Sequence, residues 1–266
     1  MTTTVKTKHR AMWASGDYPA VASELVAPLG PTLVQATGIG PGQRVLDVGA
    51  GTGNAAIPAA ETGATVTASD LTPELLTIGE KNSPVELTWA EADAEDLPFE
   101  TAAFDTVISC IGVMFAPFHS AAAGELLRVC RPGGTIGLAN WTPEGFIGRM
   151  FATMKPYAAP PPPGAQPPPL WGDPAHLASL FGDGVTDVSF ERRPLRVDHF
   201  RTAAGFRDYF KANYGPTIAV YRNIADDPAR VAELDAALLT LAESHDLGGG
   251  AMDWEYLLYT ARRTAG

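Results

Sequence analysis

The chain has few cysteines, histidines and basic residues, and each shortage argues against a class of function. Its only cysteines, Cys110 and Cys130, form no Cys-x-x-Cys pair, so we expect no disulfide framework and a reducing, cytoplasmic setting. The five histidines lie scattered without ligand spacing, so we expect no metal site. A net charge of −11 argues against a nucleic-acid partner. No apolar run approaches the ~20 residues of a membrane span, and no signal peptide is apparent.

Glycine is plentiful, and three glycines stand together in the most informative segment. The apolar run 45–48 contains Asp47 and leads into Gly49, Gly51 and Gly53, after which residues 54–60 are typical of a helix start. We predict a strand, a tight turn and a helix N-terminus that binds a ligand on bare backbone amides. A dinucleotide loop, Gly-x-Gly-x-x-Gly, would need glycine at Asn54, or glycine or alanine at Ala56, so it fits only weakly. A phosphate-binding P-loop is disfavoured because no Gly-Lys-Ser or Gly-Lys-Thr follows.

A second acidic residue follows the next predicted strand. The run 65–70 is rich in β-formers and ends at Asp70. An acid at the tip of this strand is placed to accept hydrogen bonds from the hydroxyl groups of a ribose. Because NAD and S-adenosylmethionine both carry ribose, Asp70 predicts a nucleoside ligand without choosing between them.

The Asp47-x-Gly49-x-Gly51-x-Gly53 pattern resembles the glycine loop of class I S-adenosylmethionine-dependent methyltransferases. Residues 87–99 resemble the acidic turn of the ubiquinone- and menaquinone-biosynthesis group of that family, with alanine at 92 where the group often has glycine, and residues 104–110 resemble its fourth strand. The resemblance covers residues 40–142 and implies S-adenosylmethionine as cofactor, S-adenosylhomocysteine as product and no metal. It implies that Asp93 accepts from the adenine amino group and that the Ala94 amide donates to the ring. The implied cofactor-binding residues are Asp47, Gly49, Ala50, Gly51, Gly53, Asn54, Asp70, Leu71, Asp93, Ala94 and Cys110.

Alternating strand and helix patterns predict an α/β fold, a Rossmann-like, mostly parallel seven-stranded sheet with helices on both faces and a helical cap. Strands are expected at 44–48, 65–69, 86–91, 104–110, 134–140, 185–190 and 254–262, and the resemblance makes the last one antiparallel and places it beside the fifth. We expect one domain, 1–266, comprising an N-terminal helical cap (1–40), a cofactor-binding core (41–142), a proline-rich lid and helix (143–184) and a helical insertion (202–250). For the proline run an inert connector is the alternative.

The resemblance implies in-line transfer of a methyl group to a small-molecule acceptor, through an oxygen, nitrogen or carbon nucleophile. His119 is the candidate general base, although a solvent-facing helix-start role is the alternative. The whole chain is also similar to a group of actinobacterial methyltransferases whose acceptor this likeness does not supply. Two rival functions stay open, a non-catalytic S-adenosylmethionine-binding protein and a nicotinamide-dependent oxidoreductase, and a homodimer is compatible with the sequence. The predicted acceptor-pocket residues are Trp13, Tyr18, Met114, Phe115, Trp141, Tyr209 and Tyr214.

Overall fold

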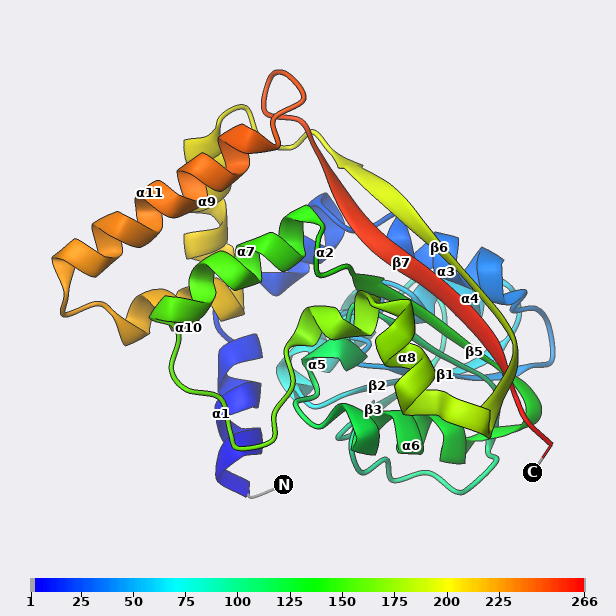
Figure 1. Cartoon of the computed structure of the whole chain (residues 1–266). Helices are drawn as coiled ribbons and strands as arrows, with labels where there is room; N and C mark the ends of the chain where they lie inside the picture. The colour runs from blue at the N-terminus through cyan, green and yellow to red at the C-terminus, as the bar shows by residue number, and fades with distance from the viewer. Residues whose placement is uncertain (1–2, 266) are drawn as a thin grey trace.

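A seven-stranded sheet in the order β3-β2-β1-β4-β5-β7-β6 organises the chain, as the computed structural model of residues 3–265 shows (Figure 1). The first five strands are parallel, and β7 runs antiparallel to both β5 and β6. This confirms the predicted fold class, including the antiparallel last strand beside the fifth. The strands are β1 (Arg44–Val48), β2 (Thr65–Asp70), β3 (Thr88–Glu91), β4 (Phe104–Cys110), β5 (Cys130–Trp141), β6 (Val185–Val197) and β7 (Met252–Arg263).

Helices cover both faces of the sheet, and several project past one end of it (Figure 1). The pairs α3–α4 and α6–α8 each pack together, while α9 and α11 pack with each other and α7 packs with α11. The helices are α1 (Thr3–Trp13), α2 (Tyr18–Glu24), α3 (Leu29–Thr37), α4 (Ala56–Glu61), α5 (Pro73–Asn82), α6 (His119–Val129), α7 (Phe146–Met154), α8 (Pro174–Phe181), α9 (Ala203–Asn213), α10 (Gly215–Asn223) and α11 (Pro228–Ser244), and short 3-10 turns include η1 (Val113–Phe115) and η3 (Pro168–Gly172). None of the helices in residues 3–265 is long and apolar enough to cross a membrane.

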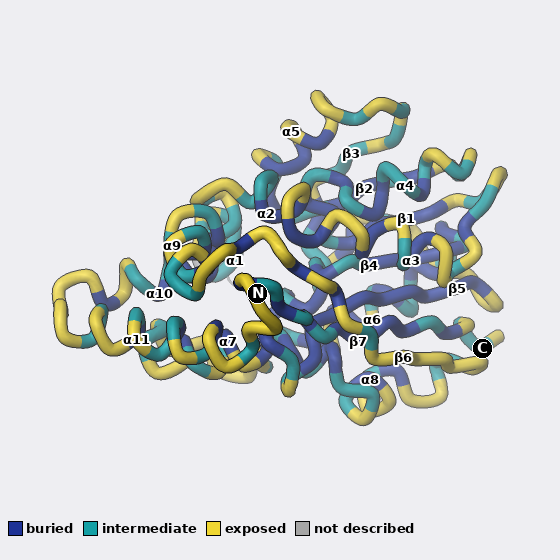
Figure 2. The backbone as a smooth tube through the Cα atoms, turned by 90° about the horizontal axis from the view of Figure 1, so that it is seen from above, coloured by how far each residue is buried: buried dark blue, intermediate teal, exposed yellow. Residues whose placement is uncertain are grey.

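The core lies along the central strands. Leu46, Ile108 and Ile136 of β1, β4 and β5 are wholly buried, as Figure 2 shows by the dark tube through these strands. Parallel strands that are covered on both faces carry continuous apolar runs, which is why the sequence pattern located these strands well.

The edge strand β6 is longer than the predicted 185–190. It pairs with β7 as far as Val197 opposite Met252, and most of it is exposed (Figure 2). The prediction stopped early because Arg192, Arg193 and Pro194 break the apolar pattern. An edge strand tolerates charges and proline, since one of its sides needs no hydrogen bonds.

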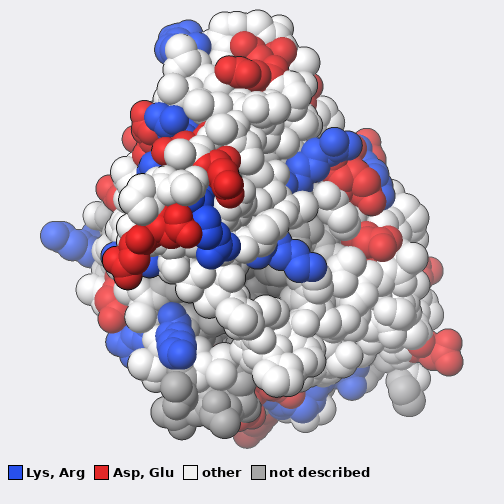
Figure 3. Space-filling model, turned by 60° about the vertical axis from the view of Figure 1, so that its left-hand side comes forward, with Lys and Arg blue, Asp and Glu red and all other residues white. Residues whose placement is uncertain are grey.

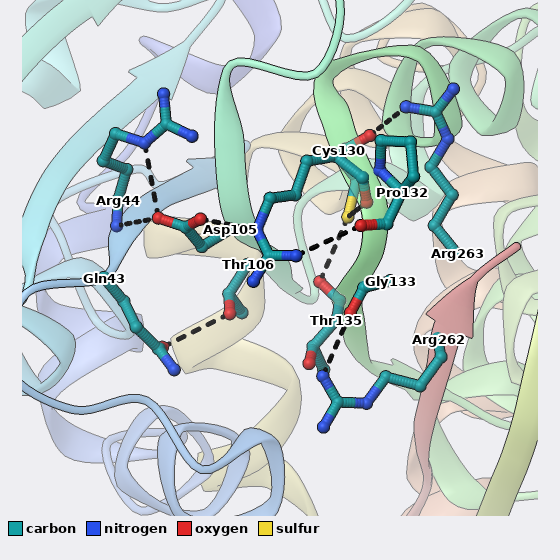
Figure 4. Close-up of polar contacts among 11 residues, drawn as sticks. Gln43, Arg44, Asp105, Thr106, Cys130, Pro132, Gly133, Thr135, Arg262 and Arg263 are labelled. Atoms are coloured by element: carbon teal, nitrogen blue, oxygen red, sulfur yellow. Dashed lines mark hydrogen bonds and ion pairs between the residues drawn. The ribbon is translucent and has the colours of Figure 1, made fainter. Parts of the chain in front are cut away.

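An arginine-rich cluster ties the strands together at the end of the sheet away from the glycine loop (Figure 4). Asp105, at the start of β4, accepts hydrogen bonds from the Arg44 backbone amide at 2.8 Å and from Arg131 Nε at 2.6 Å. The Arg44 amide is the main cause that lowers the pKa of Asp105 to about 2. This carboxylate is therefore charged and paired at every pH at which the protein is expected to work.

Candidate functional site

A pocket with a volume of about 80 Å³ lies at the carboxyl ends of β1, β2 and β4, beneath α1 and the start of α2. In open α/β sheets ligands bind at this edge, where the strand order reverses, and the order here reverses between β1 and β4. Eight residues predicted for the site line the pocket: Trp13, Tyr18, Gly49, Gly51, Asp70, Leu71, Ala94 and Phe115.

The floor of the pocket is a glycine turn that leaves no room for side chains. Gly49 has a φ of +71°, and a Cβ there would lie 2.7 Å from the Gly112 Cα on the loop after β4. Gly51, with a φ of +56°, lies under the ring of Tyr18. Both positions thus need glycine for the backbone angle, and Gly49 needs it also for the contact between two loops.

Asp47 is a buried carboxyl group with no hydrogen-bond partner for either oxygen. It lies one residue before the end of β1, beneath the glycine turn, is 1% exposed and does not itself line the pocket. Burial raises its pKa to about 7, while the Ala56 amide, outside hydrogen-bond geometry, lowers it only in part. A group so costly to bury points to a ligand whose cationic or hydrogen-bond-donating group contacts it.

Asp70 is oriented by the backbone at the tip of β2. Its Oδ2 accepts from the Gly51 amide and its Oδ1 from the Thr72 amide, each at 2.8 Å. Burial raises the pKa of Asp70 against the lowering effect of these amides. Since each oxygen keeps a second lone pair, the carboxylate can also accept from the two hydroxyls of a ribose.

The N-terminal helix α1 closes the pocket through ion pairs with acidic residues of α5 and of the turn after β3. Lys6 Nζ pairs with the carboxylates of Asp93 and Glu95, the latter at 3.0 Å, and Arg10 pairs with Glu74 at 3.1 Å. The predicted adenine acceptor, Asp93, therefore also anchors α1. It does not itself line the pocket, whereas the neighbouring Ala94 does.

Aromatic rings form the other end of the pocket wall. Trp13 packs edge-on against Phe115 at 4.6 Å and Tyr18 at 5.3 Å between ring centroids. Tyr214, predicted for the pocket, lies behind Trp13 at 5.9 Å. Burial raises the pKa of the Tyr18 phenol, and the neighbouring carboxyl groups Asp70 and Asp47 add to that rise. Tyr18 thus keeps its proton at neutral pH.

Several predicted residues lie near the pocket without lining it. Met114 and Trp141 are core residues, 0% and 3% exposed, and Trp141 packs against Trp254. Tyr209 donates from its hydroxyl to Glu24 at 2.7 Å on the outer side of α2. Four residues predicted to bind the cofactor also do not line the pocket: Ala50, Gly53, Asn54 and Cys110. Asn54 donates to the Val26 carbonyl at 3.2 Å and faces the Cys110 thiol. Their predicted roles stay untested.

His119, the candidate base, does not line the pocket. Its imidazole is 0% exposed, its Nδ1 lies 2.9 Å from His176 Nε2 of α8, and its ring packs against Trp171 of η3. Burial and then the neighbouring His176 lower its pKa to about 4. This geometry directs the ring toward α8 and η3, so His119 is not placed to take a proton from a molecule in the pocket.

The proline-rich segment supports the pocket from outside. The Gln166 amide donates to the Pro117 carbonyl at 2.9 Å, and Gly164 approaches the Phe118 ring. None of the described residues of 143–184 lines the pocket, whereas Pro117 does. The segment therefore braces a wall residue, and its role as a lid stays a prediction.

The sequence reasoning missed nine lining residues. Lys6 and His9 share one face of α1 with Trp13, at positions i, i+3 and i+7, and this spacing is the signal that could have found them. The others lie on loops that were predicted only as parts of larger segments. The nine are Lys6, His9, Thr72, Leu75, Ala92, Ile111, Gly112, Ala116 and Pro117.

These features fit S-adenosylmethionine. Gly49 and Gly51 line the pocket without side chains, Asp70 suits the ribose of the ligand, and the unpartnered Asp47 suits its cationic amino group. A pyrophosphate would instead meet two carboxyl groups. Among the described residues no group of three His, Cys, Asp or Glu side chains is placed to hold a metal ion.

Residues 46–138 match the methyltransferase domain family, which together with the partly matching relatives identifies the chain as an S-adenosylmethionine-dependent methyltransferase. It is 55% identical to the uncharacterised protein Rv1405c of Mycobacterium tuberculosis over 98% of this chain and 96% of that one. It is 38% identical to the demethylmenaquinone methyltransferase of Renibacterium salmoninarum over 43% of this chain and 48% of that one. The phosphoethanolamine N-methyltransferase 2 of Haemonchus contortus, solved with S-adenosylhomocysteine, shares the fold, with a TM-score of 0.54 and 17% identity over 88% of this chain and 52% of that one.

Proposed function

We propose that this methyltransferase passes the methyl group of S-adenosylmethionine to a small-molecule acceptor by in-line displacement. The observation that carries the proposal is the buried, unpartnered Asp47 carboxyl group below a side-chain-free turn. A sulfonium cofactor with a cationic amino group compensates this carboxyl group, whereas the pyrophosphate of a dinucleotide would be repelled by it.

The residues divide into two tasks in this proposal. Asp47, Asp70 and the Ala94 amide hold the amino group, the ribose and the adenine, so that the bound cofactor supplies an electrophilic methyl group at a fixed place. The wall of Trp13 and Phe115 orients the acceptor and keeps water away. Alignment of this kind contributes about 7–11 kcal/mol in favourable cases.

The acceptor is expected to be small because the pocket is enclosed by α1. The charged side chains on the face that Figure 3 shows are of both signs and intermingled, without one continuous basic surface. This supports the small-molecule proposal over a polyanionic substrate. The demethylmenaquinone methyltransferase of Renibacterium salmoninarum is similar over 43% of this chain, and we take a ring-shaped acceptor as the first class to test.

Calorimetric titration with S-adenosylhomocysteine and with NAD tests the cofactor. We expect micromolar or tighter binding of S-adenosylhomocysteine and none of NAD; tighter binding of NAD would overturn the proposal. Incubation with S-adenosylmethionine and a panel of phenols, quinols, acids and amines, followed by detection of S-adenosylhomocysteine, then tests turnover. Binding without release for any acceptor would favour the non-catalytic alternative.

A further inference from the structure

His9 is a half-buried histidine that lines the pocket and forms no hydrogen bond within the described part of the chain. The other ionisable side chains of the lining are engaged or hold their proton. Lys6 pairs with two carboxylates, Asp70 accepts from two backbone amides, and Tyr18 stays neutral. Only His9 is free to take up a proton from a bound molecule.

The position of His9 along α1 places it over the middle of the pocket. Lys6 lies at the Asp93 end and Trp13 at the aromatic end. With a rise of 1.5 Å per residue, His9 lies about 4.5 Å along the axis from Lys6 and about 6 Å from Trp13. A cofactor held by the Asp93 turn and Asp47 would carry its sulfonium between its nucleoside and amino-acid parts, and His9 lines the pocket between the Lys6 and Trp13 ends of α1.

The electrostatic surroundings keep the imidazole neutral. Burial is the main cause that lowers the pKa of His9, the Lys6 ammonium lowers it further, and the Asp93 carboxylate opposes them. A neutral imidazole can accept a proton near pH 7.

The rest of the wall defines what molecule could bring that proton. Trp13, Tyr18 and Phe115 offer ring faces and edges, and the remaining lining next to them is apolar, at Ile111, Ala116 and Pro117. No unpaired charge of the described lining is left to hold an ammonium or a carboxylate group of the acceptor. The fitting acceptor is therefore an uncharged ring with a hydroxyl group.

We propose that His9 is the general base that removes the proton from a ring-bound hydroxyl group of the acceptor. This inference rests on the proposed methyl transfer. As His9 takes the hydroxyl proton, the acceptor oxygen forms a bond to the methyl carbon, the bond from that carbon to sulfur breaks, and its electron pair goes to sulfur. The imidazolium that results returns its proton to water after the products leave.

The first test reads out His9 without turnover. NMR titration of the imidazole resonances, assigned with His9→Gln, is expected to give a pKa for His9 below 6.5 and a change in its resonances when S-adenosylhomocysteine and phenol bind. His9→Gln should bind S-adenosylhomocysteine within about 3-fold of wild type, because the proposal gives His9 no role in holding the cofactor. A resonance unaffected by both ligands would overturn the proposal.

The second test compares two acceptors that differ in acidity. His9→Gln is expected to lower kcat/KM for phenol by about 100-fold or more, the usual effect of a lost general base, and to leave it nearly unchanged for 4-nitrophenol at a pH at which that phenol is ionised. His245→Gln, a change at the end of α11 outside the pocket, is the control and should leave both values unchanged.

Each other outcome counts against a defined part of the proposal. Equal losses for the two phenols would show that His9 only shapes the pocket and would overturn its role as base. Wild type that binds S-adenosylhomocysteine and methylates amines but no phenol would overturn this inference and leave the proposed function standing. Wild type that does not bind S-adenosylhomocysteine would refute the proposed function itself.

Discussion

Replacement of Asp47 by asparagine is expected to stabilise the ligand-free protein while it weakens cofactor binding. The carboxyl group is 1% exposed, and neither oxygen has a hydrogen-bond partner. Asparagine has nearly the same shape and cannot ionise, so it removes the cost of a buried charge. It also removes the charge that the proposed ligand would compensate.

The size of the effect depends on pH, and its sign follows from the raised pKa. The group titrates at about 7 in the folded chain against 3.8 when it is unperturbed. The folded state therefore binds more protons between these values, and the free energy of unfolding of wild type falls as the pH rises. Integration of the two titrations gives a loss of about 2.6 kcal/mol for wild type between pH 5 and pH 8, relative to the variant. For a chain of this length that corresponds to a difference in Tm of about 5–10 °C.

Thermal and urea unfolding of both proteins at pH 5 and pH 8 measure this difference. Asp105→Asn is the matched control, because the pKa of Asp105 is lowered to about 2. The difference in free energy of unfolding between Asp105→Asn and wild type should be the same at both pH values, because the Asp105 carboxyl group is already charged in the folded and unfolded states above pH 5. A variant of Asp47 whose stability relative to wild type does not change with pH would refute the reasoning.

The ligand provides the second half of the test. A hydrogen bond to a charged group contributes about 1.5–3 kcal/mol, so Asp47→Asn should weaken S-adenosylhomocysteine binding by about 10- to 100-fold. Unchanged affinity would mean that Asp47 does not face the ligand, even if its effect on stability is as calculated.

Three further predictions concern the surrounding structure. The pKa of His119 is lowered to about 4, so the fold favours the neutral ring, and the free energy of unfolding of wild type should fall as the pH drops below 6.5. His119→Gln removes this titration. Between pH 7 and pH 5, chemical unfolding should therefore show a loss of stability that is about 2 kcal/mol smaller for the variant than for wild type. Gly112→Ala should abolish S-adenosylhomocysteine binding in calorimetry, since its Cβ would collide with the Gly49 backbone. Arg128→Met should lower the free energy of urea unfolding by about 2–4 kcal/mol, because the Leu97 and Phe99 carbonyls would lose their Arg128 donor and Glu125 would keep the Leu97 amide but lose its cation.

The cofactor half of the site could be predicted because its signals are local. Asp47 lies near the end of β1, the glycine turn directly follows that strand, and Asp70 is the last residue of β2. Both strands are recognisable from short runs of strand-forming residues. The carboxyl ends of neighbouring parallel strands meet at one edge of a sheet, so correct strands were sufficient to bring these residues together. The pocket lining at Gly49, Gly51 and Asp70 follows from that reasoning alone.

The acceptor half could be predicted only in part: Trp13, Tyr18 and Phe115 line the pocket, whereas contacts distant in sequence determine the rest. Lys6 reaches Glu95 across 89 positions, and nothing in the periodicity of α1 indicates that partner. His119 stands only two positions beyond a lining residue, Pro117, yet the packing of α8 against α6 turns its ring away. Proximity in sequence to a strand end was thus a poor guide to side-chain direction.

This difference in construction has a consequence for how the acceptor is selected. The proposed cofactor contacts lie within one stretch of the chain, from Asp47 to Ala94, and include the Gly49 turn, where a Cβ would collide with Gly112. The wall around His9 and Trp13 is carried by α1, which ion pairs, ring contacts and packing against α10 hold in place. The Arg10–Glu74 pair is exposed, and exposed ion pairs contribute little to stability. We therefore expect the inward-facing residues of α1, and with them the choice of acceptor, to change at smaller cost to the fold than the residues of the glycine turn.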